Sequence, residues 1–460
     1  MLASKRLFVF MLIVMVLVSA CGAPAATQAP AETEVPATEA PAAATEPPAA
    51  PTEAAPEPVT IQIFYPVAVD APIAKILNGY IEEFQKENPH ITVEPVFSGG
   101  YADVQTAIQT TIDGGGQPPA LAVLLATSLY DLINADYIVP MDEYVASTEG
   151  GEAYVNDFLP AFTSNSYYDN QLWSIPFQRS AVVLYYNVDM FKEAGIEPPT
   201  SWESWGNAAQ ALTVKNGDVT NWGIHFSSDW PYWLFQPLAI GNGQNIFVDD
   251  CTVAFNDPKV VEAVQFYIDL SGNYGAMPAG VQATWPTDPT DFSSGSTAMI
   301  AHTTGSLSGI LSQAKFEVGI MPYPGKEEGS YASVPGGGNL YMLKGVPKEQ
   351  QDAAWKFIEF LTTPERAADF SIQTGYIASR ASAFETAAMK EYTAKVPQAL
   401  QARDALQYAQ GELAIQGLGE VRTIFHSYIQ KAFNSEISAA DAMEAAQTEA
   451  EAALQPFCQK

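Results

Sequence analysis

The chain has 460 residues, of which 47% are hydrophobic, so it is long enough to form two or more domains with cores of their own. Its formal net charge is −31 at pH 7, from 52 Asp and Glu against 21 Lys and Arg. Binding to nucleic acid or to an anionic lipid surface requires clustered Lys and Arg, so this composition excludes both kinds of partner.

Residues 1–20 have the pattern of a signal peptide. Lys5 and Arg6 precede an apolar run over residues 7–18, which is shorter than the roughly 20 residues that span a bilayer. Small residues then lead to Cys21, as in bacterial lipoproteins, whose cysteine is lipidated and becomes the mature N-terminus. We therefore expect a lipid anchor at Cys21 on the outer face of the cell membrane, in the periplasm if an outer membrane is present. Ordinary cleavage beside an uninvolved cysteine is the alternative.

Residues 21–58 consist mainly of Ala, Pro, Thr and Glu. Such a segment buries too little apolar surface to fold, so we expect a disordered tether that separates a folded body from the membrane. A flexible tail without a role is the alternative.

The folded body is predicted to begin at Val59, with apolar strands that alternate with amphipathic helices. The predicted elements are the strands at residues 59–65, 91–97 and 119–126 and the helices at residues 73–84 and 102–113. This alternation predicts a mainly parallel sheet with helices on both faces, whose ligands bind at the carboxyl ends of the strands. Tyr101 follows the second strand and Thr127 follows the third, so both are expected at that edge.

Longer segments follow in the middle and at the end of the chain. An extended run is predicted over residues 175–186, and a helix over residues 201–213 with Thr200 as its N-cap. Residues 412–455, which are rich in Ala and Glu, are predicted to be helical. Three extended runs are expected to cross between two lobes that surround a cleft, at about residues 177–184, 298–304 and 337–343.

Residues 335–384 are predicted to form one wall of the cleft, and three glycines at residues 336–338 stand near their start. Glycine lets the backbone approach another strand or a ligand closely, and an apolar strand follows. Helices are predicted to begin at Pro347 and Pro364, and the second should end at Gly375. Tyr376 is then left on a loop, which favours a place in the cleft over a place in a core.

Several side chains are candidates for binding a solute. Trp230, Tyr232 and Trp233 cluster in a segment that proline interrupts, which predicts a loop, and aromatic faces stack on the C–H faces of sugars and polyols. Packing in a core is the alternative for these rings. Thr304 lies before a predicted helix, where it either contacts the ligand or only caps the helix. Arg422 lies near a helix start and either binds a phosphate, carboxylate or hydroxyl pair or forms a surface ion pair.

The cysteines and histidines indicate neither a metal nor a cofactor. Cys251 and Cys458 are expected to form a disulfide in an exported protein, with two unpaired buried thiols as the alternative. The four histidines lack metal-ligand spacing, and the sequence contains neither a GxSxG motif nor a phosphate-binding P-loop. We therefore expect no metal, no cofactor and no enzyme. Because carboxylates are abundant, a secreted glycan-degrading enzyme is kept as the alternative, and a surface adhesin as a third possibility.

Several blocks of the chain resemble a known family. The blocks are FSGGYADVQTAI, AMIAHTTGSLSGI, PGGGNLYMLKG, FLTTPERAADF, QTGYIASRASAF and GLGEVRTIF. Across about residues 60–450 they resemble the extracellular solute-binding proteins of ABC importers for sugars and sugar-like solutes, in the glycerol-3-phosphate-binding branch. The resemblance implies an α/β, two-lobed periplasmic-binding-protein type II fold, with a hinge and a ligand cleft between the lobes.

The resemblance also implies which residues bind the ligand. The matching positions here are Tyr101, Ser180, Trp230 or a near neighbour, Thr304, Gly337, Tyr376 and Arg422. One departure concerns the acidic residue that the branch has after the third strand, where this chain has Ala126. Either Thr127 or Ser128 replaces it, or the ligand differs. Glycerol 3-phosphate, a glycerophosphodiester and a neutral mono- or oligosaccharide all remain candidates.

The sequence thus predicts a monomeric, lipid-anchored binding protein that captures a sugar or glycerol-phosphate-like solute and delivers it to an ABC permease. We expect one lobe to comprise residues 59–178 and 302–338, and the other lobe to comprise residues 179–301 and 339–460.

Overall fold

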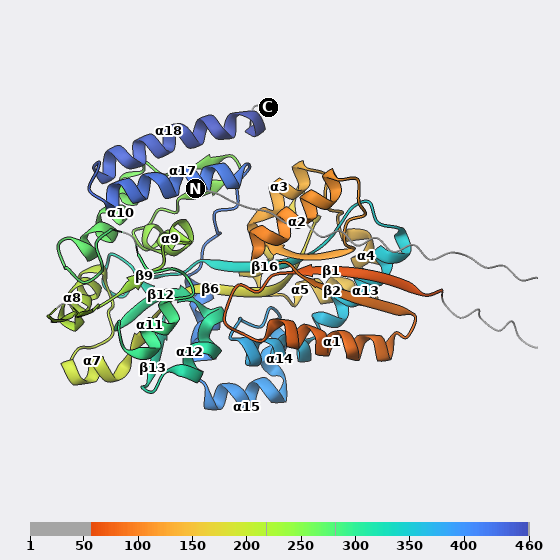
Figure 1. The fold of residues 1–460 in the computed structure, drawn as a ribbon, viewed down its shortest axis with the longest axis horizontal. Coiled ribbons are helices and arrows are strands. Elements are labelled where there is room, and N and C mark those ends of the chain that lie inside the picture. The colour runs from red at the N-terminus through yellow and green to blue at the C-terminus, as the bar shows by residue number, and fades with distance from the viewer. Residues whose placement is uncertain (1–56, 218, 281, 459–460) are drawn as a thin grey trace, which may run out of the picture. The chain divides into compact units, whose positions relative to one another are not determined.

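A computed structural model of the protein describes residues 57–217, 219–280 and 282–458 (Figure 1). The predicted signal peptide, the lipidation at Cys21 and nearly all of the predicted tether lie outside the described residues. Within those residues, every helix is too short or too polar to cross a membrane.

A large mixed sheet runs through the described part of the chain (Figure 1). Its strands follow the order β2 (Ile91–Phe97), β1 (Val59–Tyr65), β3 (Leu121–Leu125), β16 (Pro335–Met342), β6 (Ile175–Asn187), β12 (Met299–Thr303) and β9 (His225–Phe226), and β13 (Val318–Met321) also pairs with β6. β1 is parallel to β2 and β3, but β16 is antiparallel to β3 and β6, and β12 is antiparallel to β6. The prediction of a mainly parallel sheet is therefore right for β1–β3 and wrong for the pairs that β16 and β6 make, whereas β12 and β9 form a further parallel pair.

Helices and small two-stranded sheets complete the fold. The helices are α1 (Ile73–Glu87), α2 (Tyr101–Asp113), α3 (Leu129–Asn134), α4 (Asp142–Ser147), α5 (Gly151–Asn156), α6 (Pro160–Thr163), α7 (Val188–Ala194), α8 (Trp202–Leu212), α9 (Pro231–Gly241), α10 (Pro258–Ser271), α11 (Asp288–Ser294), α12 (Leu307–Gln313), α13 (Lys348–Leu361), α14 (Pro364–Thr374), α15 (Ala387–Lys395), α16 (Gln398–Asp404), α17 (Leu418–Phe433) and α18 (Ala439–Cys458). The small sheets pair β4 (Tyr167–Tyr168) with β5 (Gln171–Leu172), β7 (Val214–Asn216) with β8 (Val219–Asn221), β10 (Phe247–Asp249) with β11 (Thr252–Val253), and β14 (Tyr323–Pro324) with β15 (Tyr331–Ala332).

Two helices show that apolar spacing and proline predict local structure well. The side chains of α1 that the spacing assigns to one face are all buried, and they are Ile73, Ile76, Leu77, Tyr80, Ile81 and Phe84. α14 begins at Pro364 and ends before Gly375, whose φ of 93° suits glycine at a helix C-terminus. Both predictions are confirmed.

Three local predictions are wrong. The N-cap of α8 is Ser201 rather than Thr200, because the Ser201 hydroxyl accepts the hydrogen bond of the Ser204 backbone N–H. The aromatic segment after Trp230 is the helix α9 rather than a loop, since proline is tolerated in the first helical turn. Residues 412–417 are not helical; α17 begins only at Leu418, after Gly417 at a φ of 59°.

Two large hydrophobic cores divide the fold into two lobes (Figure 1). One core contains β1, α1 and α13, and the other contains α8, α9, α10, α17 and α18. The long strand β6 contributes Ile175 to the first core and Leu184 to the second, so the chain crosses between the lobes along this strand. This is the two-lobed α/β fold that the sequence predicts.

The division of the chain between the lobes differs from the expected one in two places. Leu340 of β16 and Phe357 of α13 pack in the first core, because β16 pairs with β3 from Gly338 to Met342. Tyr323 and Val334 pack in the second core. The limits of the lobes stay a prediction, which we revise below.

A disulfide links the C-terminal helix to the second lobe. Cys458, at the end of α18, is bonded to Cys251 in the turn between β10 and β11, with 5.7 Å between the two Cα atoms. α18 packs along α17, as Figure 1 shows, and the two bonded cysteines are 207 residues apart in sequence.

Candidate ligand-binding site

A cavity of about 730 Å³ lies where residues of both lobes meet. The loop after β1 and the start of α2 form one side of it, and the start of α9 and the loop before α11 form another. The polar residues Ser180, Thr303 and Glu412 complete its lining. Cavities of several hundred Å³ with aromatic walls and a few polar groups are typical of small-molecule sites.

The glycines of β16 are needed because other groups lie directly against this strand. A Cβ atom on Gly336 would lie 2.3 Å from Cζ2 of Trp233, and one on Gly338 would lie 2.7 Å from Cε1 of Tyr101. At Gly337 a Cβ atom would lie 1.9 Å from the carbonyl oxygen of Gln178. The prediction that the backbone makes close approaches here is confirmed, and two of the approaching groups are aromatic rings of the cavity.

Six aromatic side chains line the cavity, which are Tyr101, Trp230, Tyr232, Trp233, Trp285 and Tyr376. Trp233 is held by the hydrogen bond of its Nε1 to the carbonyl oxygen of Pro335, at 2.9 Å. The hydroxyl of Tyr101 donates to Oε1 of Gln178 at 3.1 Å. Burial raises the pKa of Tyr376 to about 12, so its hydroxyl stays protonated and able to donate.

The structure brings most of the predicted site residues together. Tyr101, Ser180, Trp230, Gly337 and Tyr376 all line the cavity. These five come from five separate stretches of the sequence, in or beside α2, β6, α9, β16 and α14.

Two predicted residues lie just behind the cavity wall. Thr304 is fully buried, and its hydroxyl accepts the hydrogen bond of the Ala181 backbone N–H at 3.1 Å, while its neighbour Thr303 lines the cavity. Thr127 is buried in the turn that follows β3, and Leu125 lines the cavity in its place.

Arg422 also lies outside the lining, on α17. Its guanidinium carbon is 5.9 Å from the centroid of the Trp230 ring, within the range of a cation–π contact. It therefore touches the site through Trp230.

The sequence interpretation missed several residues of the cavity, among them Asp229, Trp285 and Glu412. Asp229 precedes the aromatic cluster and accepts the hydrogen bond of the Trp285 backbone N–H. Trp285 is one of eight tryptophans in the chain, and Glu412 is one of 52 acidic residues. Nothing local in the sequence marks them, because their place depends on the packing of distant segments.

Trp285 connects the two sides of the cavity. Its Nε1 donates to the carbonyl oxygen of Ala68 at 3.0 Å, and its ring stacks on His302 with 3.8 Å between the centroids. Burial lowers the pKa of His302 to about 3, so this imidazole is neutral near pH 7.

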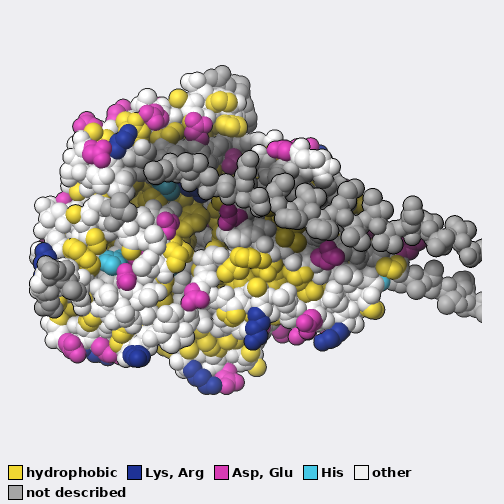
Figure 2. Space-filling model, viewed as in Figure 1, with side chains coloured by type: hydrophobic (Ala, Val, Ile, Leu, Met, Phe, Trp, Pro, Cys, Tyr) yellow, Lys and Arg dark blue, Asp and Glu magenta, His cyan; other side chains and the backbone are white. Residues whose placement is uncertain are grey.

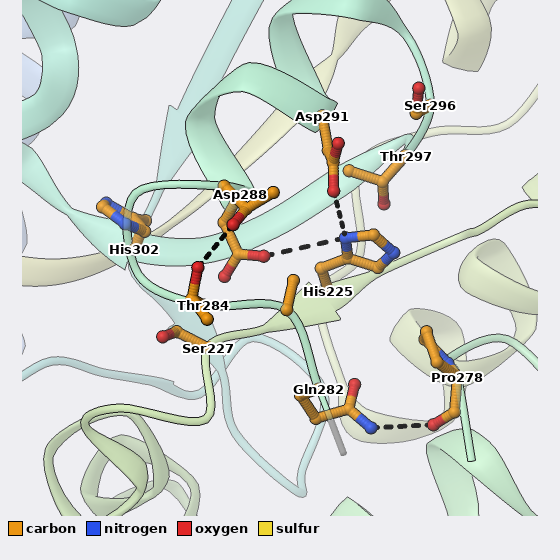
Figure 3. Close-up of polar contacts among 12 residues, drawn as sticks. His225, Ser227, Pro278, Gln282, Thr284, Asp288, Asp291, Ser296, Thr297 and His302 are labelled. Carbon is orange, nitrogen blue, oxygen red and sulfur yellow. Dashed lines mark hydrogen bonds and ion pairs between the residues drawn. The ribbon is translucent and has the colours of Figure 1, made fainter. Parts of the chain in front are cut away.

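A buried polar cluster anchors the segment that carries Trp285 (Figure 3). Nδ1 of His225 lies 3.7 Å from Oδ1 of Asp288 and 3.6 Å from Oδ2 of Asp291, at the first turn of α11. Burial, followed by the negative charge of Asp291, raises the pKa of Asp288 to about 8. Gln282 donates to the carbonyl oxygen of Pro278 at 2.8 Å at the other end of the segment (Figure 3). In the described part of the chain, no group of three His, Cys, Asp or Glu side chains is arranged to hold a metal ion.

Comparison with known proteins identifies the family. Residues 79–398 match the family described as "Bacterial extracellular solute-binding protein". The chain belongs to this family. It is therefore a solute-binding protein of the ABC-importer type, as the resemblance in the sequence predicts, and its family is one of binding proteins rather than enzymes.

Relatives of this solute-binding protein include named transport proteins. It is 26% identical over 401 residues to the sn-glycerol-3-phosphate-binding periplasmic protein UgpB of Salmonella typhimurium, covering 82% of this chain and 89% of that one. It is 27% identical over 347 residues to UgpB of Escherichia coli (strain K12), covering 72% and 77% of the two chains.

Two solved structures have the same fold. UgpB of Mycobacterium tuberculosis, in complex with glycerophosphocholine, has a TM-score of 0.77 at 23% identity and covers 86% of this chain and 99% of that one. Maltose-bound MalE3 of T. maritima has a TM-score of 0.74 at 19% identity and covers 85% and 99%.

Proposed function

We propose that this protein captures an uncharged carbohydrate or an sn-glycerol-3-phosphate-like solute in the cavity and delivers it to the permease of an ABC importer. The observation that carries the proposal is the cavity of about 730 Å³, lined by six aromatic side chains and by residues of both lobes. A solute that contacts both lobes stabilises the closed state of the protein, which is the state that a permease would recognise.

Each predicted site residue has a proposed role. Tyr101, Trp230 and Tyr376 pack on the solute, while Ser180 and the backbone N–H of Gly337 donate hydrogen bonds to it. Thr304 acts indirectly, since its hydroxyl already binds the backbone next to Ser180. Arg422 supports the ring of Trp230 from α17, and Thr127 supports the turn after β3.

The lobes are proposed to divide the chain according to their cores. Residues 59–178 and 339–361 belong to the first lobe, and residues 182–301 and 410–458 to the second, with β6 and β16 forming the hinge between them. The segment around α14 is proposed to join the lobes a third time, because Phe370 packs in the first core and Ala368 packs in a third cluster that includes Val183 and Ile300 of the second lobe.

We also propose that the protein is a monomer held outside the cytoplasm by a lipid on Cys21 and by the tether that follows. The support comes from the sequence pattern of residues 1–58 and from the extracellular location in the family description. On the face drawn in Figure 2, Asp and Glu side chains are scattered rather than gathered in one patch, which suits a soluble body that is not drawn to anionic lipid.

The test is a thermal-shift screen against sn-glycerol 3-phosphate, glycerophosphodiesters and a panel of sugars. A ligand that binds only the folded state raises the melting temperature. At a ligand concentration of a hundred times Kd, the free energy of unfolding rises by about 2.7 kcal/mol. A shift with any of these solutes supports the proposal. No shift with all of them, or turnover of a glycan by the protein, would refute it.

A further inference from the structure

Glu412 is a cavity residue that the predicted set of ligand contacts does not include. It lies in the segment between α16 and α17, is 3% exposed, and lines the cavity together with Ser180 and Gly337. A carboxyl group that is almost fully buried is rare unless it has a bonding partner.

The backbone on both sides of Glu412 is clamped to α9. The side-chain amide of Gln236 donates to the carbonyl oxygen of Gly411 at 2.9 Å, and its oxygen accepts the N–H of Leu413 at 3.2 Å. Asn245 donates to the same Gly411 carbonyl at 3.0 Å. Since Gln236 and Leu413 are fully buried, this clamp holds the Glu412 side chain at the cavity wall.

The carboxyl of Glu412 has unused capacity for hydrogen bonds. The Tyr232 hydroxyl donates to Oε1 over a long distance of 3.4 Å, and Oε2 has no hydrogen-bond partner among the described residues. Burial raises the pKa of Glu412 to about 8, against the opposing effects of the Arg179 guanidinium and the Tyr232 hydroxyl. Near pH 7 the carboxyl therefore holds a proton, and it offers both a donor and an acceptor, as a sugar hydroxyl does.

The charges around the cavity favour an uncharged solute over a phosphate. The described residues that line the cavity include the acidic side chains Asp103, Asp229 and Glu412, and none of them is Lys or Arg. A phosphate group in this cavity would have nearby carboxyl groups and no lining Lys or Arg. The helices α2 and α9 begin at the cavity, but Asp103 already accepts the Gly100 N–H of the first and His426 accepts the Tyr232 N–H of the second.

We infer that Glu412 is a ligand-binding and specificity-determining residue, whose carboxyl hydrogen-bonds a hydroxyl group of an uncharged, polyhydroxylated solute. It supplies from the segment before α17 the acidic contact that Ala126, after β3, cannot make. This inference rests on the proposed function, since it assigns a role within the same cavity.

The test is isothermal titration of the purified full chain. The probes are uncharged sugars and polyols, with sn-glycerol 3-phosphate as the anionic probe. Glu412→Ala and Glu412→Met remove the hydrogen-bonding groups, and the second keeps most of the side-chain volume. Glu412→Gln keeps a donor and an acceptor, and Glu391→Gln, at an exposed Glu paired with Lys395 on α15, is the charge-matched control.

We expect an uncharged solute to bind the wild type, and Glu412→Ala and Glu412→Met to weaken its binding at least tenfold. Glu412→Gln should remain within about threefold of the wild type, and the control should not differ from it. Unchanged affinity in both Ala and Met variants would overturn the role of Glu412 and leave the transport function standing. Binding of sn-glycerol 3-phosphate alone would overturn the solute class, and binding of no probe would overturn both the inference and the proposed function.

Discussion

Replacing Gly337 by Ala should strongly destabilise the protein. Gly337 has a φ of 92°, a conformation that L side chains rarely adopt, and an added Cβ atom would lie 1.9 Å from the carbonyl oxygen of Gln178. Both groups belong to the paired strands β16 and β6, where Gly337 faces Arg179 and Gly338 faces Gln178. Because the obstacle is backbone rather than a flexible side chain, the strands themselves must move apart.

The size of the effect follows from two contributions. Holding alanine at this positive φ costs about 1–3 kcal/mol. Moving the strands apart by roughly 1 Å weakens buried hydrogen bonds of the ladder, at about 1–3 kcal/mol for a group left unsatisfied. We therefore expect Gly337→Ala to lower the free energy of unfolding by about 2–6 kcal/mol, out of the 5–15 kcal/mol typical of folded proteins.

Urea unfolding, followed by tryptophan fluorescence, measures this change. The matched control is Gly79→Ala in α1, where an added Cβ atom meets nothing within 4 Å. The control should stabilise the protein by about 0.5–1 kcal/mol, because alanine favours a helix over glycine. The same substitution thus has opposite signs at the two positions. A Gly337→Ala variant as stable as the wild type would show that the strands yield freely, and the argument from close approach would be wrong.

Three further predictions concern charge, covalent links and the cavity wall. Burial raises the pKa of Glu412 to about 8 from its ordinary 4.5, so the folded chain keeps a proton that the unfolded chain has released, and stability should fall as pH rises from about 4.5 to 8. In Glu412→Gln, the free energy of unfolding measured with urea should decrease less between pH 5 and pH 8 than in the wild type. An equal decrease in the two proteins would contradict this prediction. Cys458→Ser, or reduction of the bond to Cys251, opens a link between residues 207 apart and should cost up to about 5 kcal/mol, seen as a lower melting temperature; equal melting with and without reductant would refute this. Trp285→Phe keeps an aromatic ring but removes the donor to the Ala68 carbonyl, so solute affinity measured by titration should fall about 2–10-fold, and equal affinity would exclude a role for that contact.

Local rules predicted most elements of the fold. The helical spacing in α1, the proline start and glycine end of α14, and the extended run of β6 all follow from short stretches of sequence. One wrong prediction, the direction of β16, concerns a neighbour outside the local pattern. β16 is antiparallel to β3 because the chain returns from about 200 residues away, and short-range patterns carry no information about that direction.

The residues of the candidate site also fall into two groups, those that the local sequence marks and those that only packing between distant segments places. Tyr101, Ser180, Gly337 and Tyr376 were found because glycine turns and motif resemblance mark them locally, and the structure gathers them around one cavity. Glu412 carries no such mark, since its position depends on the clamp that Gln236 of α9 makes to its backbone.

The sequence by itself determined the fold class and the family, because apolar periodicity, glycine placement and blocks that resemble the family can each be read from a few residues at a time. Only the tertiary structure decided which side chains face the solute. Thr304 and Arg422 lie behind the wall while Glu412 and Trp285 form it, and the difference arises from packing between segments more than 100 residues apart, as in the hydrogen bond from Trp285 to Ala68.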